Sequence, residues 1–249
     1  MNFRNINDEF INQNNARILS SIEIQPRYMP EKKTQEKPDK ADVSDDIKTF
    51  LMTANTCQYR NTLTEINKLA GFSAGTGSRI AHYCEKKNLI KILQVKFGRG
   101  RPKYPVLLPD AYEILGINEK KFYGKGAGSE HILYQHLIKQ YFSDHKPIIE
   151  LNRNDKFIDV AINKNDLLVC IEVAMTSVNE RENIHKDFSK AKADFVIVAC
   201  IDQKVLKEVK EIVSDLPENI RNKTQAILLS ELLSKKPGEF IESLQLPRH

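Results

Sequence analysis

The sequence predicts an α/β protein, α+β overall, with two domains that differ in secondary structure. In the first domain, three short amphipathic helices precede a basic β-hairpin. In the second, helices and short β-prone runs alternate after an opening hairpin, as in a mixed sheet flanked by helices. A proline-rich charged stretch and a glycine-rich stretch interrupt these patterns. They divide the chain into an N-terminal segment at 1–44, a first domain at 45–122 and a second at 127–249.

The composition is that of a soluble protein with a sizeable core. The chain has 249 residues, of which 41% are hydrophobic and 29% are charged. No apolar run approaches the ~18 residues of a membrane span, and MNFRNINDEF is polar where a signal peptide would be apolar. We therefore expect a cytoplasmic protein without a membrane partner, whose four widely separated cysteines remain reduced thiols.

The N-terminal segment holds a candidate helix and a linker. Apolar residues within 10–19 fit one face of a short helix, which could recruit a protein partner. The stretch 26–44 has three prolines, dense charge of both signs and almost no aliphatic residue. It cannot bury enough apolar surface to order itself, so we interpret it as a linker.

The positive charge is concentrated in the middle of the chain. The formal net charge is +5, to which segments 1–44, 45–125 and 126–249 contribute 0, +7 and −2. Between Lys86 and Pro109 there are seven basic residues and no acidic one. Such a block attracts a polyanion.

The apolar spacing of the first domain places its helices and its hairpin. Helices are expected at 45–54, at 63–71 after a Thr62 cap, and from about 74 to 86. The stretch LIKILQVKFGRGRPKYPVLLP then contains two β-prone runs around a glycine-containing turn, and DAYEILG closes the domain as a helix.

This order of elements resembles the winged-helix family of DNA-binding domains. In that family the third helix enters the major groove, and the hairpin, or wing, contacts phosphates or the minor groove. The resemblance implies that basic residues on the third helix and along the wing bind DNA. These residues are Arg79, Lys86, Lys87, Lys96, Arg99, Arg101 and Lys103. The alternatives are a solvated basic face and a wing that contacts protein.

The second domain is expected to begin with a helix at 129–142, which Ser129 caps. The strand IIEL and then the hairpin FIDVAINKNDLLVCIEVA follow this helix. With a turn centred on Lys164 and residue 165, Asp159 would pair with Cys170 and lie diagonally beside Glu172. Glu172 interrupts the apolar run LLVCIEVA. Burying a carboxylate there is costly unless it is paired, protonated or bound to a cation.

The spacing of Asp159 and Glu172 resembles the PD-(D/E)XK nuclease superfamily, which has the restriction-endonuclease-like fold. In that superfamily two acids, often with a third on the preceding helix, bind Mg²⁺ beside the scissile phosphate, and a lysine two residues after the second acid orients or activates water. The resemblance implies that Asp159, Glu172 and Glu130 bind Mg²⁺ or Mn²⁺. Ala174 occupies the lysine position, and Lys186 on the following helix is our choice for the missing cation. An exposed helix face is the alternative for this lysine.

Several other polar residues can be interpreted in two ways, as functional or as structural. Glu130 could merely stabilise the N-terminus of its helix. His131 and Gln135, on the same helix, are secondary candidates for substrate contact. Thr176 and Ser177 could donate to a phosphate or cap the next helix.

Two functions follow from these observations. The first is a Mg²⁺-dependent DNA endonuclease whose winged helix delivers the nuclease domain to DNA. The second is a DNA-binding regulator or mobile-element accessory protein, in which an inactive nuclease-like domain mediates dimerisation or partner binding. Ala174 favours the second function, and the retained Asp159 and Glu172 favour the first. The expected partner is DNA, and a second copy of the chain is a further candidate.

Overall fold

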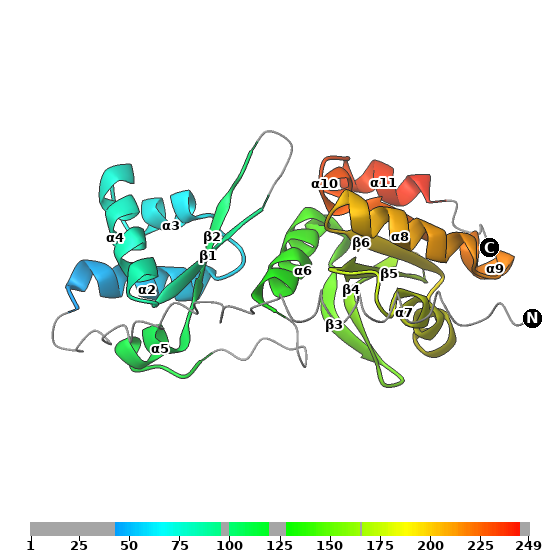
Figure 1. Ribbon diagram of the computed structural model, residues 1–249, viewed down its shortest axis with the longest axis horizontal. Coiled ribbons are helices and arrows are strands. Elements are labelled where there is room, and N and C mark those ends of the chain that lie inside the picture. The colour runs from blue at the N-terminus through cyan, green and yellow to red at the C-terminus, as the bar shows by residue number, and fades with distance from the viewer. Residues whose placement is uncertain (1–42, 96–99, 120–127, 165, 245–249) are drawn as a thin grey trace, which may run out of the picture. The chain divides into compact units, whose positions relative to one another are not determined.

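The computed structural model describes residues 43–95, 100–119, 128–164 and 166–244. We call the part within 43–119 the helix-hairpin unit and the part within 128–244 the sheet unit (Figure 1). The predicted N-terminal helix, nearly all of the 26–44 linker, Lys96 and Arg99 lie outside the described residues. No helix within the described ranges is long and apolar enough to cross a membrane. All four cysteines are free thiols.

The helix-hairpin unit has the order of elements that the sequence predicts. Its elements are α2 (Asp45–Cys57), α3 (Leu63–Leu69), α4 (Ala74–Lys86), β1 (Ile90–Gln94), β2 (Lys103–Leu107) and α5 (Pro109–Leu115). The side chains of Thr62 and Glu65 cap α3 reciprocally, and Ser73 caps α4. β1 and β2 pair antiparallel, and most of the buried apolar side chains of this unit form one core.

Gly77 lies where α4 packs closely against α3. A Cβ at Gly77 would overlap the side-chain amide of Asn67, which is buried, whereas one at Gly75 would meet no atom within 4 Å. Gly77→Ala should therefore cost about 1–3 kcal/mol of stability through overpacking. Gly75→Ala should leave the melting temperature unchanged or raise it, since alanine is the better helix former. Calorimetry of both variants tests this, and equal melting temperatures would contradict the close approach.

The sheet unit contains a five-stranded mixed sheet among its described residues. Its strands are β3 (Ile148–Arg153), β4 (Lys156–Lys164), β5 (Leu167–Ala174), β6 (Phe195–Cys200) and β7 (Thr224–Leu228). Its main helices are α6 (Ser129–Tyr141), α7 (Glu180–Lys186), α8 (Gln203–Ser214), α9 (Glu218–Arg221), α10 (Leu229–Leu232) and α11 (Pro237–Ser243). The strands lie in the order β3-β4-β5-β6-β7, antiparallel from β3 to β5 and parallel from β5 to β7. The predicted α/β class is confirmed.

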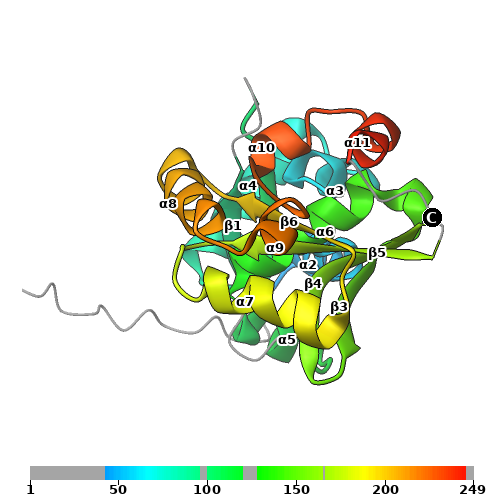
Figure 2. The ribbon, with the colours of Figure 1, turned by 90° about the vertical axis from the view of Figure 1, so that its right-hand side faces the viewer.

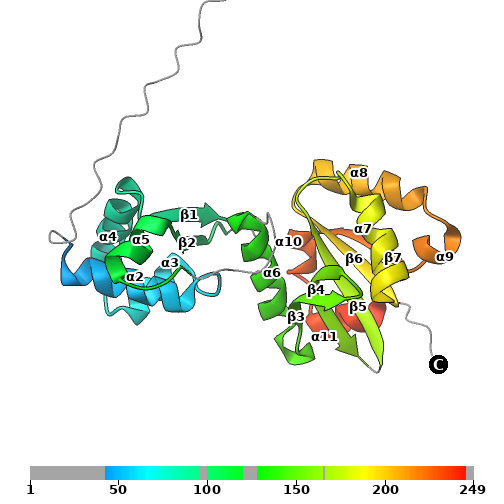
Figure 3. The same ribbon diagram turned by 90° about the horizontal axis from the view of Figure 1, so that it is seen from below.

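Helices cover both faces of the sheet (Figures 2 and 3). One core contains side chains of α6, α10 and α11, and the other contains side chains of α7 and α8. Because both faces are buried, β5 and β6 are almost continuously apolar. Glu172 is the exception in β5, and it faces α7, since Cys170 and Ala174 on either side of it belong to that core.

The predicted register of the β4–β5 hairpin was wrong by two residues. Ala161, rather than Asp159, pairs with Cys170. Lys164 pairs with Leu167, so the centre of the hairpin lies one residue later than predicted, and Asp166 has the positive φ of 63° that tight hairpins favour. A shift of two residues leaves each side chain on the same face of the sheet, because the side-chain period of a strand is two.

The predicted cap of α6 was also wrong. Gly128 is the N-cap residue, Ser129 is the first residue of the helix, and no side-chain hydrogen bond caps it. Gly128 has the extended backbone that an N-cap needs, so Ser129 is already inside the helix. Ser177 does not cap α7 through its side chain, because its Oγ donates to Glu208 Oε2 at 2.6 Å.

Candidate metal centre

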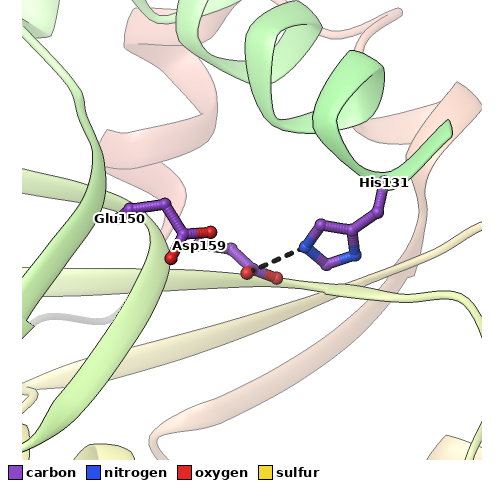
Figure 4. A group of neighbouring side chains, drawn as sticks. All are labelled: His131, Glu150 and Asp159. Atoms are coloured by element: carbon purple, nitrogen blue, oxygen red, sulfur yellow. Dashed lines mark hydrogen bonds and ion pairs between the residues drawn. The ribbon is translucent and has the colours of Figure 1, made fainter. Parts of the chain in front are cut away.

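Three side chains from three elements of the sheet unit meet at one point (Figure 4). His131 of α6, Glu150 of β3 and Asp159 of β4 each bring one ligand atom to within 4.8 Å of the other two. We call these residues the triad. All three are half-buried, so the surrounding protein positions them while solvent can still reach them. Among the described residues, no other group of three His, Cys, Asp or Glu side chains has this spacing.

The backbone of β3 aims Glu150 at its partner. Glu150 has a φ of 53° in the middle of the strand, a conformation that costs a residue other than glycine about 1–2 kcal/mol. The pairing of β3 with β4 is interrupted at Glu150 and continues on both sides of it. At this interruption Glu150 lies opposite Asp159. Strained backbone of this kind often occurs at functional sites.

Gln135 holds the two carboxylates together. It lies one turn after His131 on α6 and is only 1% exposed. Its Nε2 donates to Glu150 Oε1 at 2.5 Å and to Asp159 Oδ1 at 3.0 Å. Asp159 Oδ2 accepts from the backbone N–H of Val173 at 2.7 Å. The two acids are therefore fixed in place by neutral donors, and both secondary candidates on this helix, His131 and Gln135, are part of the cluster.

His131 is bound directly to Asp159. Its Nε2 lies 3.0 Å from Asp159 Oδ1. Burial alone would lower the pKa of His131, but the hydrogen bond and charge of Asp159, followed by the charges of Glu150 and Glu180, raise it above its usual value. A metal ion at this position would compete with that proton, because a histidine ligand must be neutral.

A buried ionic network adjoins the triad. Lys156 Nζ lies 3.1 Å from Glu172 Oε1 and 3.2 Å from Asp187 Oδ1, and all three side chains are buried. Lys156 begins β4, and Asp187 begins the π-helical turn (Asp187–Ala191) that follows α7. Asp159 links the two groups, because it accepts a hydrogen bond from the residue after Glu172 and its charge contributes to a raised Glu172 pKa.

This region holds more carboxylates than cations. Burial raises the pKa of Glu172 well above its usual value, and neighbouring carboxylates raise it further. Burial also raises the pKa of Glu150, that of Asp187 to about 6 and that of Glu180, the first residue of α7, to about 7. Lys156 is the only lysine or arginine that is buried among the described residues. Acids with so little compensating charge favour the uptake of protons or of a metal cation.

The structure brings two of the four predicted catalytic residues together. Asp159 belongs to the triad, and Glu172 belongs to the adjoining network. Glu130 is exposed in the first turn of α6 and is not part of either group. Lys186 Nζ pairs with Glu182 Oε1 at 2.7 Å, and their side chains are 41% and 63% exposed. This geometry matches the exposed-face interpretation of Lys186.

Sequence reasoning missed Glu150, Lys156 and Asp187 as members of this region. Glu150 follows two isoleucines in IIEL, so the cost of burying a carboxylate, which singled out Glu172, could have identified it. Lys156 and Asp187 carry no such signal. A charged residue at the start of a strand or on a helix is ordinarily exposed.

The basic residues of the helix-hairpin unit are accessible to solvent. Arg79 and Lys86 are exposed on α4, and Lys87 after it is half-buried. Arg101, just before the returning strand, and Lys103, its first residue, are also exposed.

No protein-family model, no curated protein and no solved structure matches the chain.

Proposed function

We propose that this protein is a metal-dependent deoxyribonuclease that hydrolyses phosphodiester bonds at the triad. The convergence of His131, Glu150 and Asp159 within 4.8 Å carries the proposal. The antiparallel hairpin that bears Asp159 and Glu172, followed by parallel strands, supports membership of the PD-(D/E)XK superfamily. Within this proposal, Glu150 and His131 take the ligand role that the sequence suggested for Glu130.

The donor set of the triad fits a divalent cation. Its two carboxylates offer the hard oxygen ligands that Mg²⁺ and Mn²⁺ prefer. The imidazole nitrogen of His131 favours Mn²⁺ over Mg²⁺, because Mg²⁺ is usually bound through oxygen alone. The surplus of buried carboxylates adds electrostatic attraction for either ion. We therefore expect Mn²⁺ to bind more tightly than Mg²⁺.

The side chains around the triad have separate tasks in this mechanism. A divalent cation would supply a nucleophilic water at neutral pH and offset the charge on the phosphate. Gln135 keeps Glu150 and Asp159 at a fixed separation, and the Val173 N–H holds the second oxygen of Asp159. Without a cation, the carboxylates would repel a phosphodiester, so activity should require the metal.

The helix-hairpin unit supports DNA as the substrate. Its order of helices and hairpin resembles that of a winged helix, and its segment of the sequence holds the whole basic surplus of the chain. Exposed cations can contact phosphates irrespective of sequence, and this electrostatic contact supplies most non-specific affinity for DNA. Arg79 on α4 is the candidate for a base contact, because it is long and exposed on the helix that would enter the major groove.

A cleavage assay tests the proposed activity. Labelled duplex, single-stranded and branched DNA should be cut in Mn²⁺ or Mg²⁺ and left intact in EDTA. Glu150→Gln should slow cleavage about 100-fold or more, because it removes a ligand charge while keeping the size of the side chain. The matched control is Glu231→Gln on α10, an exposed acid paired with Lys235, which should cut at the wild-type rate. Cleavage that survives both EDTA and Glu150→Gln would refute the site.

A binding assay tests the proposed wing. The double variant Arg101→Ala with Lys103→Ala should weaken binding to every DNA sequence and reduce the slope of log K against log salt by about 2. Fluorescence anisotropy over a range of salt concentrations measures both quantities. The matched control is Lys204→Ala with Lys207→Ala, two exposed lysines on α8. An unchanged slope in the wing variant would exclude these residues from the DNA contact.

A DNA-binding protein without nuclease activity is the second candidate. It is favoured by Ala174 at the lysine position and by Lys186, whose ammonium pairs with Glu182. Under this alternative, DNA would be retarded in a gel but stay intact with either metal. The triad would then retain a structural metal or no metal at all, which calorimetric titration with Mn²⁺ distinguishes.

A further inference from the structure

Lys156 is an unusual residue for the position that it occupies. It is 8% exposed, and the core on its side of the sheet contains Ile158, Cys170 and Ala174. Burying an ammonium is costly, and a buried ion pair is often no more stabilising than a well-packed apolar side chain. A buried, charged lysine at this position therefore points to a role other than stability alone.

The contacts of Lys156 indicate that role. Its Nζ reaches Glu172 of β5 and Asp187 of the π-helical turn at 3.1 and 3.2 Å, so one ammonium joins two carboxylates from different elements. π-helical turns often occur at functional sites, and this one places Asp187 fully inside the protein. Glu172 is in turn next to Val173, whose N–H holds Asp159. The chain of contacts runs from Asp187 through Lys156 to a ligand of the triad.

We propose that Lys156 is a positioning residue of the metal centre, which holds the Glu172 carboxylate in place behind Asp159 by pairing it with a fixed ammonium. The proposal rests on the proposed function, because it takes the triad to be a metal site. Partners beyond the direct ligands of a metal typically change its affinity or its activity about 10- to 100-fold when they are removed. Lys186 has no comparable contact, since it pairs with an exposed acid on its own helix.

Binding of Mn²⁺, measured by calorimetric titration and electron paramagnetic resonance, tests the proposal apart from catalysis. Lys156→Met should weaken Mn²⁺ binding about 10- to 100-fold. Lys156→Arg retains the charge and should recover most of the affinity. Lys204→Met, on the exposed face of α8, is the matched control and should bind as the wild type does.

Lys156→Met leaves two buried carboxylates unpaired and could fail to fold, so a second variant separates folding from positioning. Lys156→Met with Asp187→Asn removes one charge of each sign and should restore the circular dichroism spectrum and the melting transition. Its Mn²⁺ affinity should stay low, because Glu172 still lacks its ammonium. A folded double variant with wild-type Mn²⁺ affinity would overturn the proposal, as would failure of Lys156→Arg to recover affinity while folded.

The same experiment separates this proposal from the proposed nuclease activity. If the wild type binds Mn²⁺ and Lys156→Met weakens it, but no DNA is cut, the positioning role stands and the nuclease fails. If DNA is cut and the folded Lys156 variants bind Mn²⁺ normally, the nuclease stands and the positioning role fails. Absence of Mn²⁺ binding to the wild type would overturn both.

Discussion

Asp159→Asn should abolish metal binding and metal-dependent DNA cleavage while leaving the affinity for DNA unchanged. Asp159 Oδ1 meets His131 Nε2 and Gln135 Nε2, and its Oδ2 meets the Val173 N–H. An asparagine has the same shape, but it carries no charge and its NH₂ would face one of these donors. We expect Mn²⁺ affinity and the cleavage rate each to fall about 100-fold or more, because a direct ligand is lost.

Asp155→Asn is the matched control for this variant. Asp155 is exposed in the β3–β4 turn and has a φ of 62°, a conformation that asparagine tolerates. It should bind Mn²⁺ and cut DNA as the wild type does. If Asp159→Asn retains Mn²⁺ affinity within a factor of three, the triad is not the metal site and the proposed mechanism fails with it.

The sequence could predict this part of the site because the relevant signals are local. Glu172 was identified from the cost of a carboxylate in an apolar strand, and Asp159 from its place in the preceding strand of the same hairpin. Neither identification depended on the exact register of the hairpin, which was wrong by two residues. The order of helices and strands was predictable for the same reason, since it depends on periodicity within short windows.

The remainder of the site depends on tertiary geometry that no local pattern encodes. Glu150 reaches Asp159 because its backbone adopts a positive φ within a strand, which favours glycine rather than glutamate. Lys156 is buried because Glu172 and Asp187 arrive from two other elements to pair with it. Lys186 was chosen as the cation because it lies on the helix that follows the hairpin, and Lys156 was not considered. In the folded chain the π-helical turn after that helix contributes Asp187 instead.

The stability of the metal-free protein should fall as the pH rises from 5 to 8. The pKa of Asp187 is raised from 3.8 to about 6 and that of Glu180 from 4.5 to about 7, in each case chiefly by burial. Between the unfolded and folded pKa values, the folded chain binds more protons than the unfolded chain, so the free energy of unfolding decreases with pH. A pKa difference of about two corresponds to ~3 kcal/mol for each buried carboxylate. The raised pKa of His131 acts in the same direction, because its favourable charge is lost as the pH rises.

Calorimetry in EDTA across this pH range measures the fall in stability. Added Mn²⁺ should restore the stability at pH 8, because the carboxylates are ionised there and free to attract the cation. The variant Glu180→Gln with Asp187→Asn cannot ionise at these positions, so the pH dependence of its melting temperature should be flatter, and the remaining slope comes from Glu150, Glu172 and His131. Its matched control, Glu182→Gln with Asp215→Asn, changes two acids of exposed ion pairs and should keep the wild-type slope. A flat profile in the wild type would mean that folding does not shift the pKa values of the buried acids, so that neighbouring groups already compensate their charges without metal. The attraction that this charge surplus offers a divalent cation would then be absent, leaving the three direct ligands to account for all of the affinity.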